Sequence, residues 1–183
     1  RLKNSTVLSN KVEEAMKVLN MPGAIFEIKI SQKNSMDGFV LLKDELIEGN
    51  MKGIDTIEFF LSANPGEKVK PLTSIASGGE ISRIMLAIKT VFQKLDPVQT
   101  LVFDEIDSGI SGKAAGKVAD QLLKLSKSKQ VFCITHLSQI ARKADHHLHV
   151  AKFVENEKTF VTASYLNKTE SSQIINDLFM SAE

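Results

Sequence analysis

An apolar segment that ends in two carboxylates is the part of the sequence with the clearest chemical meaning. Leu101, Val102 and Phe103 are followed directly by Asp104 and Glu105. A short apolar run of this kind is typical of a buried strand, and α/β proteins bind ligands at the carboxyl ends of such strands. In nucleotide hydrolases the first acid of such a pair holds Mg²⁺, usually through water, and the second orients or deprotonates the attacking water. A helix cap or a solvated loop would explain the pair equally well by itself.

The motif Ser77-Gly78-Gly79-Glu80 stands at the start of a predicted helix over 80–95. Its serine and glutamate have the spacing of a capping box, which accounts for those two residues. It does not account for the glycines, each of which costs roughly 1 kcal/mol relative to alanine within a helix. Glycines at a helix start let backbone N–H groups approach an anion, and the helix dipole favours negative charge there. The motif therefore fits the γ-phosphate of a nucleotide, and a serine that caps the free helix could bind that phosphate when a partner arrives.

A histidine, His136, directly follows a second apolar run, Val131–Thr135. If the two apolar runs form neighbouring strands, His136 lies at the same sheet edge as the acidic pair and could hydrogen-bond a transferring phosphoryl group. A lone histidine is more often structural, but the position of this one, after the acidic pair, favours a role in the chemistry.

The triplet Asp107-Ser108-Gly109 closely follows the acidic pair. By composition it is an ordinary turn. A turn at that place could also carry contacts across an interface.

Two further groups of residues resemble ligand sites but lack parts of them. Gly112-Lys113 looks like the end of a phosphate-binding loop, but the chain has no glycine five places earlier and no Ser or Thr after the lysine. His146, His147 and His149 could indicate a metal, but on a strand only the last two share a face, and one nearby acidic residue does not complete a site. The sequence therefore favours neither a phosphate-binding loop nor a metal centre at these places.

Regular apolar spacing predicts the elements that must position these residues. Helices over 80–95 and 113–127 alternate with strands over 100–103 and 131–135. This alternation predicts an α/β half with parallel strands covered on both faces. The other elements predicted there are a short helix at 138–144, a pair of strands at 149–154 and 159–165 joined by a turn at 155–157, and a last amphipathic helix at roughly 170–180.

The first half of the chain is predicted to combine a helix with an antiparallel hairpin. Apolar residues at helical spacing mark 6–20, and strands are predicted at 24–30 and 56–62. Residues 31–55 are polar and dotted with glycine, with a possible short helix in 39–48.

Composition indicates one ordinary globular domain, with 183 residues of which 43% are hydrophobic, and no general attraction to nucleic acid at a net charge of +1. A weak basic cluster at Lys124, Lys127 and Lys129 is expected to be a solvated face. The single cysteine, Cys133, is expected in the core of a protein from a reducing cytoplasm. No apolar run is long enough to cross a membrane and no signal peptide opens the chain, whose first residue, Arg1, indicates an excised fragment.

In their order along the chain, these motifs resemble those of ABC-type ATPases. Ser77–Glu80 resembles the signature motif, Leu101–Glu105 the Walker B strand with its catalytic glutamate, and Asp107–Gly109 the D-loop. His136 resembles the switch histidine. The signature ends in Glu80, where membrane transporters usually have glutamine, and this favours the SMC-like branch, which acts on DNA.

Longer runs are similar to the bacterial RecN family of DNA-repair ATPases, over roughly 64–150. The similar runs are 64–67, 70–72, 75–87, 103–112 and 135–141. The resemblance implies an ABC/SMC-type ATPase head, of which 21–183 form the C-terminal lobe with a partly parallel sheet flanked by helices and a small antiparallel hairpin. Residues 1–20 would then be the returning end of a coiled coil. The segment 31–55 is longer than expected and has no assigned role.

The resemblance also implies how ATP is bound. ATP and Mg²⁺ would lie between two heads of a homodimer, with Asp104 holding Mg²⁺ through water and with Glu105 and His136 catalytic in the same head. Ser77, Gly78, Gly79 and Glu80 would contact the ATP of the other head. The Walker A loop lies in the family's N-terminal half, which is a required partner absent from this chain, so the chain alone is expected to bind ATP weakly or not at all. The implied task is repair of DNA double-strand breaks in the bacterial cytoplasm, at the nucleoid, with DNA bound by the full-length protein and no membrane involved.

Two other functions remain open at this point. A transporter nucleotide-binding domain is disfavoured by Glu80, and a non-catalytic interaction module is disfavoured by the intact acidic pair and His136. If strands of a missing half complete the parallel sheet, an open sheet edge and an apolar patch are expected on this chain.

Overall fold

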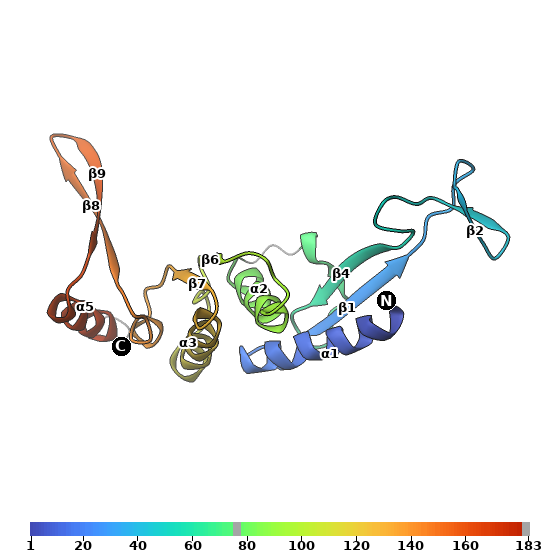
Figure 1. Cartoon of the computed structure of the whole chain (residues 1–183). Coiled ribbons are helices and arrows are strands. Elements are labelled where there is room, and N and C mark those ends of the chain that lie inside the picture. Colours follow the sequence, from blue (N-terminus) through green and yellow to red (C-terminus); the bar gives the residue numbers. More distant parts are fainter. Residues whose placement is uncertain (75–77, 181–183) are drawn as a thin grey trace. The chain divides into compact units, whose positions relative to one another are not determined.

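The computed structural model describes residues 1–74 and 78–180, and the chain divides into two compact units, Arg1–Ser77 and Gly78–Glu183 (Figure 1). The motif residues from Gly78 onward all belong to the second unit. Ser77 lies outside the described residues. No helix of the described part is long and apolar enough to cross a membrane.

The first unit combines one long helix with a small antiparallel sheet. The sheet has the order β1-β4-β5, and α1 lies against β1, as predicted for the helix and the hairpin. Val12 and Met16 of α1, Phe26 of β1 and Leu61 of β4 are almost fully buried and form its core. The elements are α1 (Leu2–Val18), β1 (Ile25–Ser31), β2 (Val40–Leu42), β3 (Glu45–Ile47), β4 (Thr56–Ser62), β5 (Lys70–Pro71) and the 3-10 helix η1 (Leu72–Ser74).

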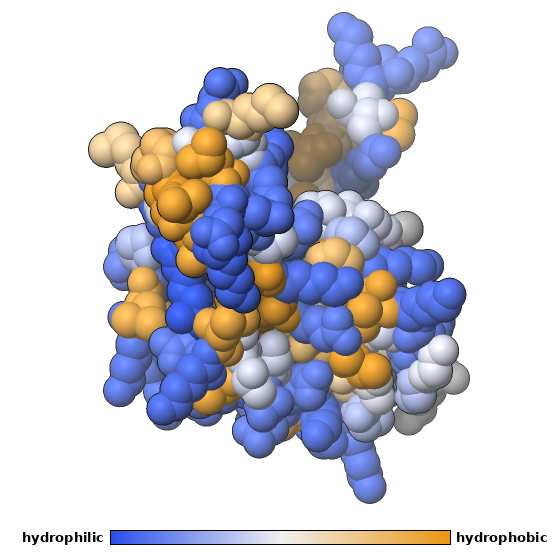
Figure 2. Space-filling view, turned by 90° about the vertical axis from the view of Figure 1, so that its right-hand side faces the viewer, coloured by the Kyte–Doolittle hydropathy of each residue, from blue (hydrophilic) through white to orange (hydrophobic). Residues whose placement is uncertain are grey.

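The segment between β1 and β4 forms a hairpin, so the short helix predicted in 39–48 is wrong. Leu42 of β2 pairs with Glu45 of β3 across a two-residue turn, and both turn residues, Lys43 and Asp44, have positive φ angles of 50° and 65°. Two positive φ angles give the tight turn whose twist matches antiparallel strands. Apolar surface gathers over this segment in the space-filling view, which looks onto the side of the molecule where Figure 1 labels β2 (Figure 2). Its exposed large apolar side chains are those of Met36, Phe39, Leu41, Leu46 and Met51.

The second unit has the α/β order that the sequence predicts. β6 and β7 pair in parallel, with Leu101 opposite Val131 and Phe103 opposite Cys133. The buried side chains of α2 and α3 form most of its core. The elements are α2 (Gly78–Phe92), β6 (Thr100–Phe103), α3 (Gly112–Ser126), β7 (Gln130–Cys133), α4 (Ser138–Ala141), β8 (Leu148–Glu155), β9 (Lys158–Tyr165) and α5 (Lys168–Met180).

The parallel strands are covered on one face only, which corrects the prediction of cover on both faces. Leu101 and Phe103 are buried, whereas Val102, Phe132 and Ile134, which alternate with the inward set, are 65%, 44% and 59% exposed. Parallel strands read as continuous apolar runs because both of their faces are normally buried. The chain therefore presents the apolar patch that was expected for a sheet completed by further strands.

The strands β8 and β9 form the predicted closing hairpin, in which nearly every residue is exposed (Figure 1). Val150 and Val161 are exposed on one face, and the rings of Phe153 and Phe160 stack on the other with centroids 5.6 Å apart. A lone two-stranded hairpin is marginal in water, and among the described elements β8 and β9 pack chiefly on each other.

Candidate functional site

The parallel pairing of β6 and β7 brings the ends of both strands to one edge of the sheet. The hydrogen-bond ladder continues past β7, because the Ile134 N–H donates to the carbonyl oxygen of Phe103 at 2.9 Å. Asp104 and Glu105 follow β6, and His136 follows two residues after Ile134. The condition set by the sequence, that the two apolar runs be neighbouring strands, is therefore met.

The two carboxylates after β6 are exposed and held by their own turn. The Glu105 N–H donates to Oδ1 of Asp104 at 2.9 Å, and the Ser108 N–H donates to the Glu105 carbonyl at 3.0 Å. Glu105 has a φ of 55°, in the left-handed region that residues other than glycine seldom adopt. Such backbone strain persists only where neighbouring contacts enforce it, and it gathers at functional sites. The turn thus fixes the backbone from which the Glu105 carboxylate projects.

Asp107 is buried beneath this edge and ties the two strand ends together. Its side chain is only 4% exposed. Oδ2 accepts a hydrogen bond from the Thr135 hydroxyl at 2.5 Å and another from the His136 N–H at 3.0 Å. The resemblance implies a D-loop at this turn, which could carry contacts across an interface. The Asp107 carboxylate binds inside its own unit, while Ser108 and Gly109 are exposed.

The imidazole of His136 also lies beside Asp107. Its Nδ1 lies 3.2 Å from Oδ2 of Asp107, while the side chain as a whole is 73% exposed. The contact is an ion-pair distance, which places the carboxylate charge beside the ring.

The glycines at the start of α2 fit closely against the turn after β6. A Cβ on Gly79 would lie 2.8 Å from Cβ of Ser108 and 3.0 Å from each of the carbonyl oxygens of Glu105 and Ser108. A Cβ on Gly78 would collide with the Glu105 carboxylate. Gly79 therefore answers a packing need within one unit, which the spacing argument misses, whereas at Gly78 an added Cβ would meet only the end of a flexible side chain. Both positions are compatible with an approach to phosphate. The capping box involves Ser77, which lies outside the described residues, and Glu80 is half-buried.

Two residues of α2 that sequence reasoning passes over also hold this turn. The Ser82 hydroxyl donates to the Asp104 carbonyl at 2.6 Å. Nη1 of Arg83 donates to the carbonyls of Ile106 at 3.2 Å and Ser108 at 2.8 Å, and Arg83 is only 7% exposed. Burial lowers the pKa of the Arg83 guanidinium, and the nearby charge of Glu80 opposes this.

A signal for Arg83 is present in the sequence. It stands four residues after Gly79 and four before Ala87, both of which are buried, so it occupies the inward stripe of the helix. A charged residue in that stripe marks a position where the core needs donors.

The other polar groups flagged by the sequence have structural roles. Nε2 of His147 lies 2.8 Å from the Ala141 carbonyl and Nδ1 lies 3.2 Å from the Ser171 hydroxyl, so both ring nitrogens are engaged. Lys129, predicted to be solvated, is buried and donates to the carbonyls of Asp96 and Val98 at 2.6 and 2.7 Å. Its ammonium group thus links the segment before β6 to the segment before β7.

The described residues hold no group of three or more His, Cys, Asp or Glu side chains that could bind a metal among themselves. Cys133 is half-buried behind the sheet edge. Burial first, and then the charges of Asp107 and Asp104, raise the pKa of its thiol to about 12. A thiol with that pKa is a core group rather than a nucleophile.

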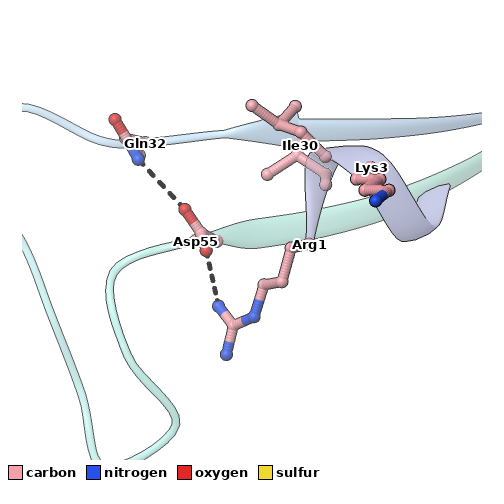
Figure 3. A pocket seen from close by; sticks show the side chains of 6 residues that line it. Arg1, Lys3, Ile30, Gln32 and Asp55 are labelled. Atoms are coloured by element: carbon pink, nitrogen blue, oxygen red, sulfur yellow. Dashed lines mark hydrogen bonds and ion pairs between the residues drawn. The ribbon is translucent and has the colours of Figure 1, made fainter.

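A pocket in the first unit is built around an ion pair (Figure 3). Nη1 of Arg1 lies 2.7 Å from Oδ2 of Asp55, and Nε2 of Gln32 donates to Oδ1 of the same carboxylate at 3.0 Å. The hydrogen bonds from Gln32 and then Arg1 lower the pKa of Asp55. The whole lining belongs to the first unit, whereas the described motif residues belong to the second.

Comparison with known proteins identifies relatives along most of the chain. No family model matches it. The DNA repair protein RecN of Bacillus subtilis is 36% identical over 178 residues, which cover 96% of this chain and 31% of that protein. The RecN of Treponema pallidum is 54% identical over 114 residues, or 62% of this chain and 20% of that protein. The chain thus spans less than a third of the length of these relatives, and the resemblance predicted from the sequence is confirmed.

Solved structures with the same fold are SMC heads. The SMC head domain with a coiled coil and joint from Pyrococcus yayanosii matches 96% of this chain and 30% of its own, with a TM-score of 0.58 and 21% identity. A structure described as concerning ATP-driven dimerization and DNA-stimulated activation of SMC ATPases matches 97% of this chain and 94% of its own, with a TM-score of 0.51 and 21% identity. At this identity the likeness shows the fold, and the predicted SMC-type head is confirmed.

Proposed function

Because this chain resembles the RecN proteins along most of its length and has the fold of an SMC head, we propose that it is the C-terminal part of an ATP-hydrolysing head in a DNA-repair protein. The observation that carries the proposal is the single sheet edge that collects Asp104, Glu105 and His136. The full protein would act in recombinational repair of double-strand breaks, at the nucleoid in the bacterial cytoplasm. Residues 1–20 would form the end of its coiled coil.

The acidic residues at this edge suit a hydrated magnesium ion. Mg²⁺ prefers oxygen ligands and keeps several of its waters, so it needs few protein carboxylates. Asp104 is exposed, and one of its oxygens is occupied by the Glu105 N–H, which leaves the other for a water of the ion. Bound there, Mg²⁺ would neutralise charge that develops on the phosphates.

The remaining roles would fall to Glu105, to His136 and to the start of α2. Glu105, fixed by its turn, would orient or deprotonate the attacking water. His136, whose backbone N–H is held by Asp107, would donate a hydrogen bond from Nε2 to the transferring phosphoryl group. The N–H groups at the start of α2, with Ser77 before them, would face the ATP of a second head, since a helix N-terminus favours an anion.

Two partners are needed for activity in this proposal. The N-terminal half of the same protein would supply the Walker A loop, and the exposed apolar face of Val102, Phe132 and Ile134 supports its docking on the sheet. A second head would complete each ATP site, so hydrolysis would depend on dimerisation. The chain alone would then be inactive.

The direct test measures ATP hydrolysis by the chain alone, by the chain mixed with the upstream half, and by the full-length protein. Activity is expected only in the last two. In the full-length protein, Glu105→Gln should retain ATP binding and accumulate as an ATP-bound dimer with turnover lowered at least hundredfold. Asp120→Asn is the matched control, because it also replaces an exposed carboxylate with an amide, but on α3. Activity in the chain alone, or normal turnover by the Gln variant, would overturn the proposal.

A further inference from the structure

We propose that Arg83 couples the start of α2 to the turn that carries Glu105, so that the two half-sites of one head respond to each other. The inference rests on the proposed function, in which the start of α2 serves the ATP of the second head while Glu105 serves the ATP of its own. Arg83 touches neither nucleotide in this view and is a positioning residue.

The tie consists of two neighbouring side chains that hold three carbonyls of one turn. Ser82 binds the carbonyl of Asp104, and Arg83 binds those of Ile106 and Ser108. The carbonyls flank Glu105 on both sides. A shift of α2 by even 1 Å would break these hydrogen bonds unless the turn moved with it.

At Gly79, the start of α2 and the turn after β6 are in direct contact. The space for a Cβ is already occupied by Ser108 and by two carbonyl oxygens. Contacts pull the turn toward α2 through Arg83, and contacts at Gly79 prevent it from moving closer. A motion of the helix start is therefore passed to the turn in both directions.

An arginine is an expensive way to hold a turn if stability were the only purpose. Arg83 as a whole is 7% exposed, its Nη1 donates to neutral carbonyls, and its Nε has no hydrogen-bond partner among the described residues. Burial of the charge costs free energy that the nearby Glu80 offsets only in part, and an apolar side chain of similar size would avoid that cost. The planar fork of donors has one advantage over an apolar residue, since it fixes the positions of two carbonyls at once.

The tie extends to His136 through Asp107. Asp107 lies between the two carbonyls that Arg83 holds, and its carboxylate binds the Thr135 hydroxyl and the His136 N–H. Displacing the turn would thus displace the switch histidine as well as Glu105. Closure of the second head on α2 would therefore shift both Glu105 and His136 of the first head.

The test uses the full-length protein with Arg83→Met, Arg83→Lys and Lys89→Met. Lys89→Met is the matched control, because it removes a half-buried cation from the same helix, where Lys89 pairs with Asp96 at 2.6 Å. ATP hydrolysis is measured against ATP concentration, with ATP binding and dimerisation measured separately. Arg83→Met should lower kcat at least tenfold and bring the Hill coefficient of hydrolysis to 1, with ATP binding unchanged. Arg83→Lys should lie between, since it can hold one carbonyl, and Lys89→Met should keep the Hill coefficient of the wild type.

Hydrogen exchange tests the tie without any nucleotide. The Ser108 and Ile110 amides donate to the carbonyls of Glu105 and Asp107 within the turn. In the nucleotide-free protein, Arg83→Met should speed exchange over 104–110 at least tenfold, while Lys89→Met should not. If the wild-type protein fails to hydrolyse ATP, the proposed function is wrong. Hydrogen exchange still shows whether Arg83 holds the turn. Wild-type exchange over 104–110 in Arg83→Met, or cooperative hydrolysis by that variant, would overturn the inference.

Discussion

Replacement of Asp107 should separate the stability of the sheet edge from its chemistry. Asp107→Ala leaves the Thr135 hydroxyl and the His136 N–H without their acceptor. Each donor left unsatisfied in a partly buried site costs about 1–3 kcal/mol, and solvent reaches the exposed His136, so about 2–4 kcal/mol is expected in all. In a unit of this size that loss lowers the midpoint of thermal unfolding by roughly 8–20 °C.

Asp107→Asn keeps an oxygen that can accept both of those hydrogen bonds but removes the negative charge next to Nδ1 of His136. Its cost in stability should be about 1 kcal/mol. Misplacing a catalytic group by about 1 Å can cost roughly a hundredfold in rate, so a fall of tenfold to hundredfold in kcat is expected.

The assay compares turnover of full-length Asp107→Asn, His136→Ala and the double variant, alongside their thermal unfolding. If Asp107 acts through His136, the double variant should be no slower than His136→Ala alone. Two independent losses that multiply in the double variant would refute this reasoning. So would normal turnover of Asp107→Asn, since the aspartate would then only stabilise the fold.

Two further predictions concern packing and the cysteine. Gly79→Ala should destabilise the full-length protein by about 1–3 kcal/mol, because its methyl group meets backbone carbonyls. The control Gly116→Ala meets nothing within 4 Å and should be neutral or stabilise α3 by up to about 1 kcal/mol. Thermal unfolding compares the two variants, and equal unfolding midpoints would contradict the close fit at Gly79. Cys133 should resist alkylation at pH 8: with its pKa raised from 9.0 to about 12, about one thiol in ten thousand is ionised instead of about one in ten. Reaction is expected only near pH 12 or after denaturation, and mass-spectrometric mapping of Cys133 at pH 8 with and without denaturant checks this.

The sequence predicts the positions of the strand ends because their pattern is nearly unique. Two continuous apolar runs, each followed by polar residues and separated by an amphipathic helix, leave few options besides neighbouring parallel strands. The meeting of Asp104, Glu105 and His136 at one edge follows from that topology alone. The same reasoning predicts that both faces of the strands are covered, and this prediction fails at Val102 and Phe132. Their apolar character indicates that they become buried, but no described element of this chain covers them.

The contacts that reinforce the site lie beyond sequence reasoning for physical reasons. Asp107 resembles an ordinary turn residue, and only the fold shows that its carboxylate points into the unit. The turn between β2 and β3 consists of Lys43 and Asp44, which both have positive φ angles. Neither residue is a glycine, so the sequence gives no sign of this turn. Arg83 could have been found as a charge in the buried stripe of α2, but its acceptors are main-chain carbonyls, which have no sequence signal.

The glycines at the start of α2 could serve both packing and phosphate binding, and this affects how variants of Gly78 and Gly79 are interpreted. A loss of hydrolysis in Gly79→Ala would not demonstrate a phosphate contact, because the same methyl group displaces the turn that carries Glu105. Gly78 differs, since its added Cβ would meet only the carboxylate end of Glu105, which can rotate away, and no backbone atom of the turn. Gly78→Ala therefore leaves the frame of the turn in place while narrowing the approach to an anion at the helix start. If the motif binds phosphate of a second head, Gly78→Ala should impair ATP-dependent dimerisation with little change in unfolding temperature. An effect on stability without one on dimerisation would leave packing as the glycines' whole purpose.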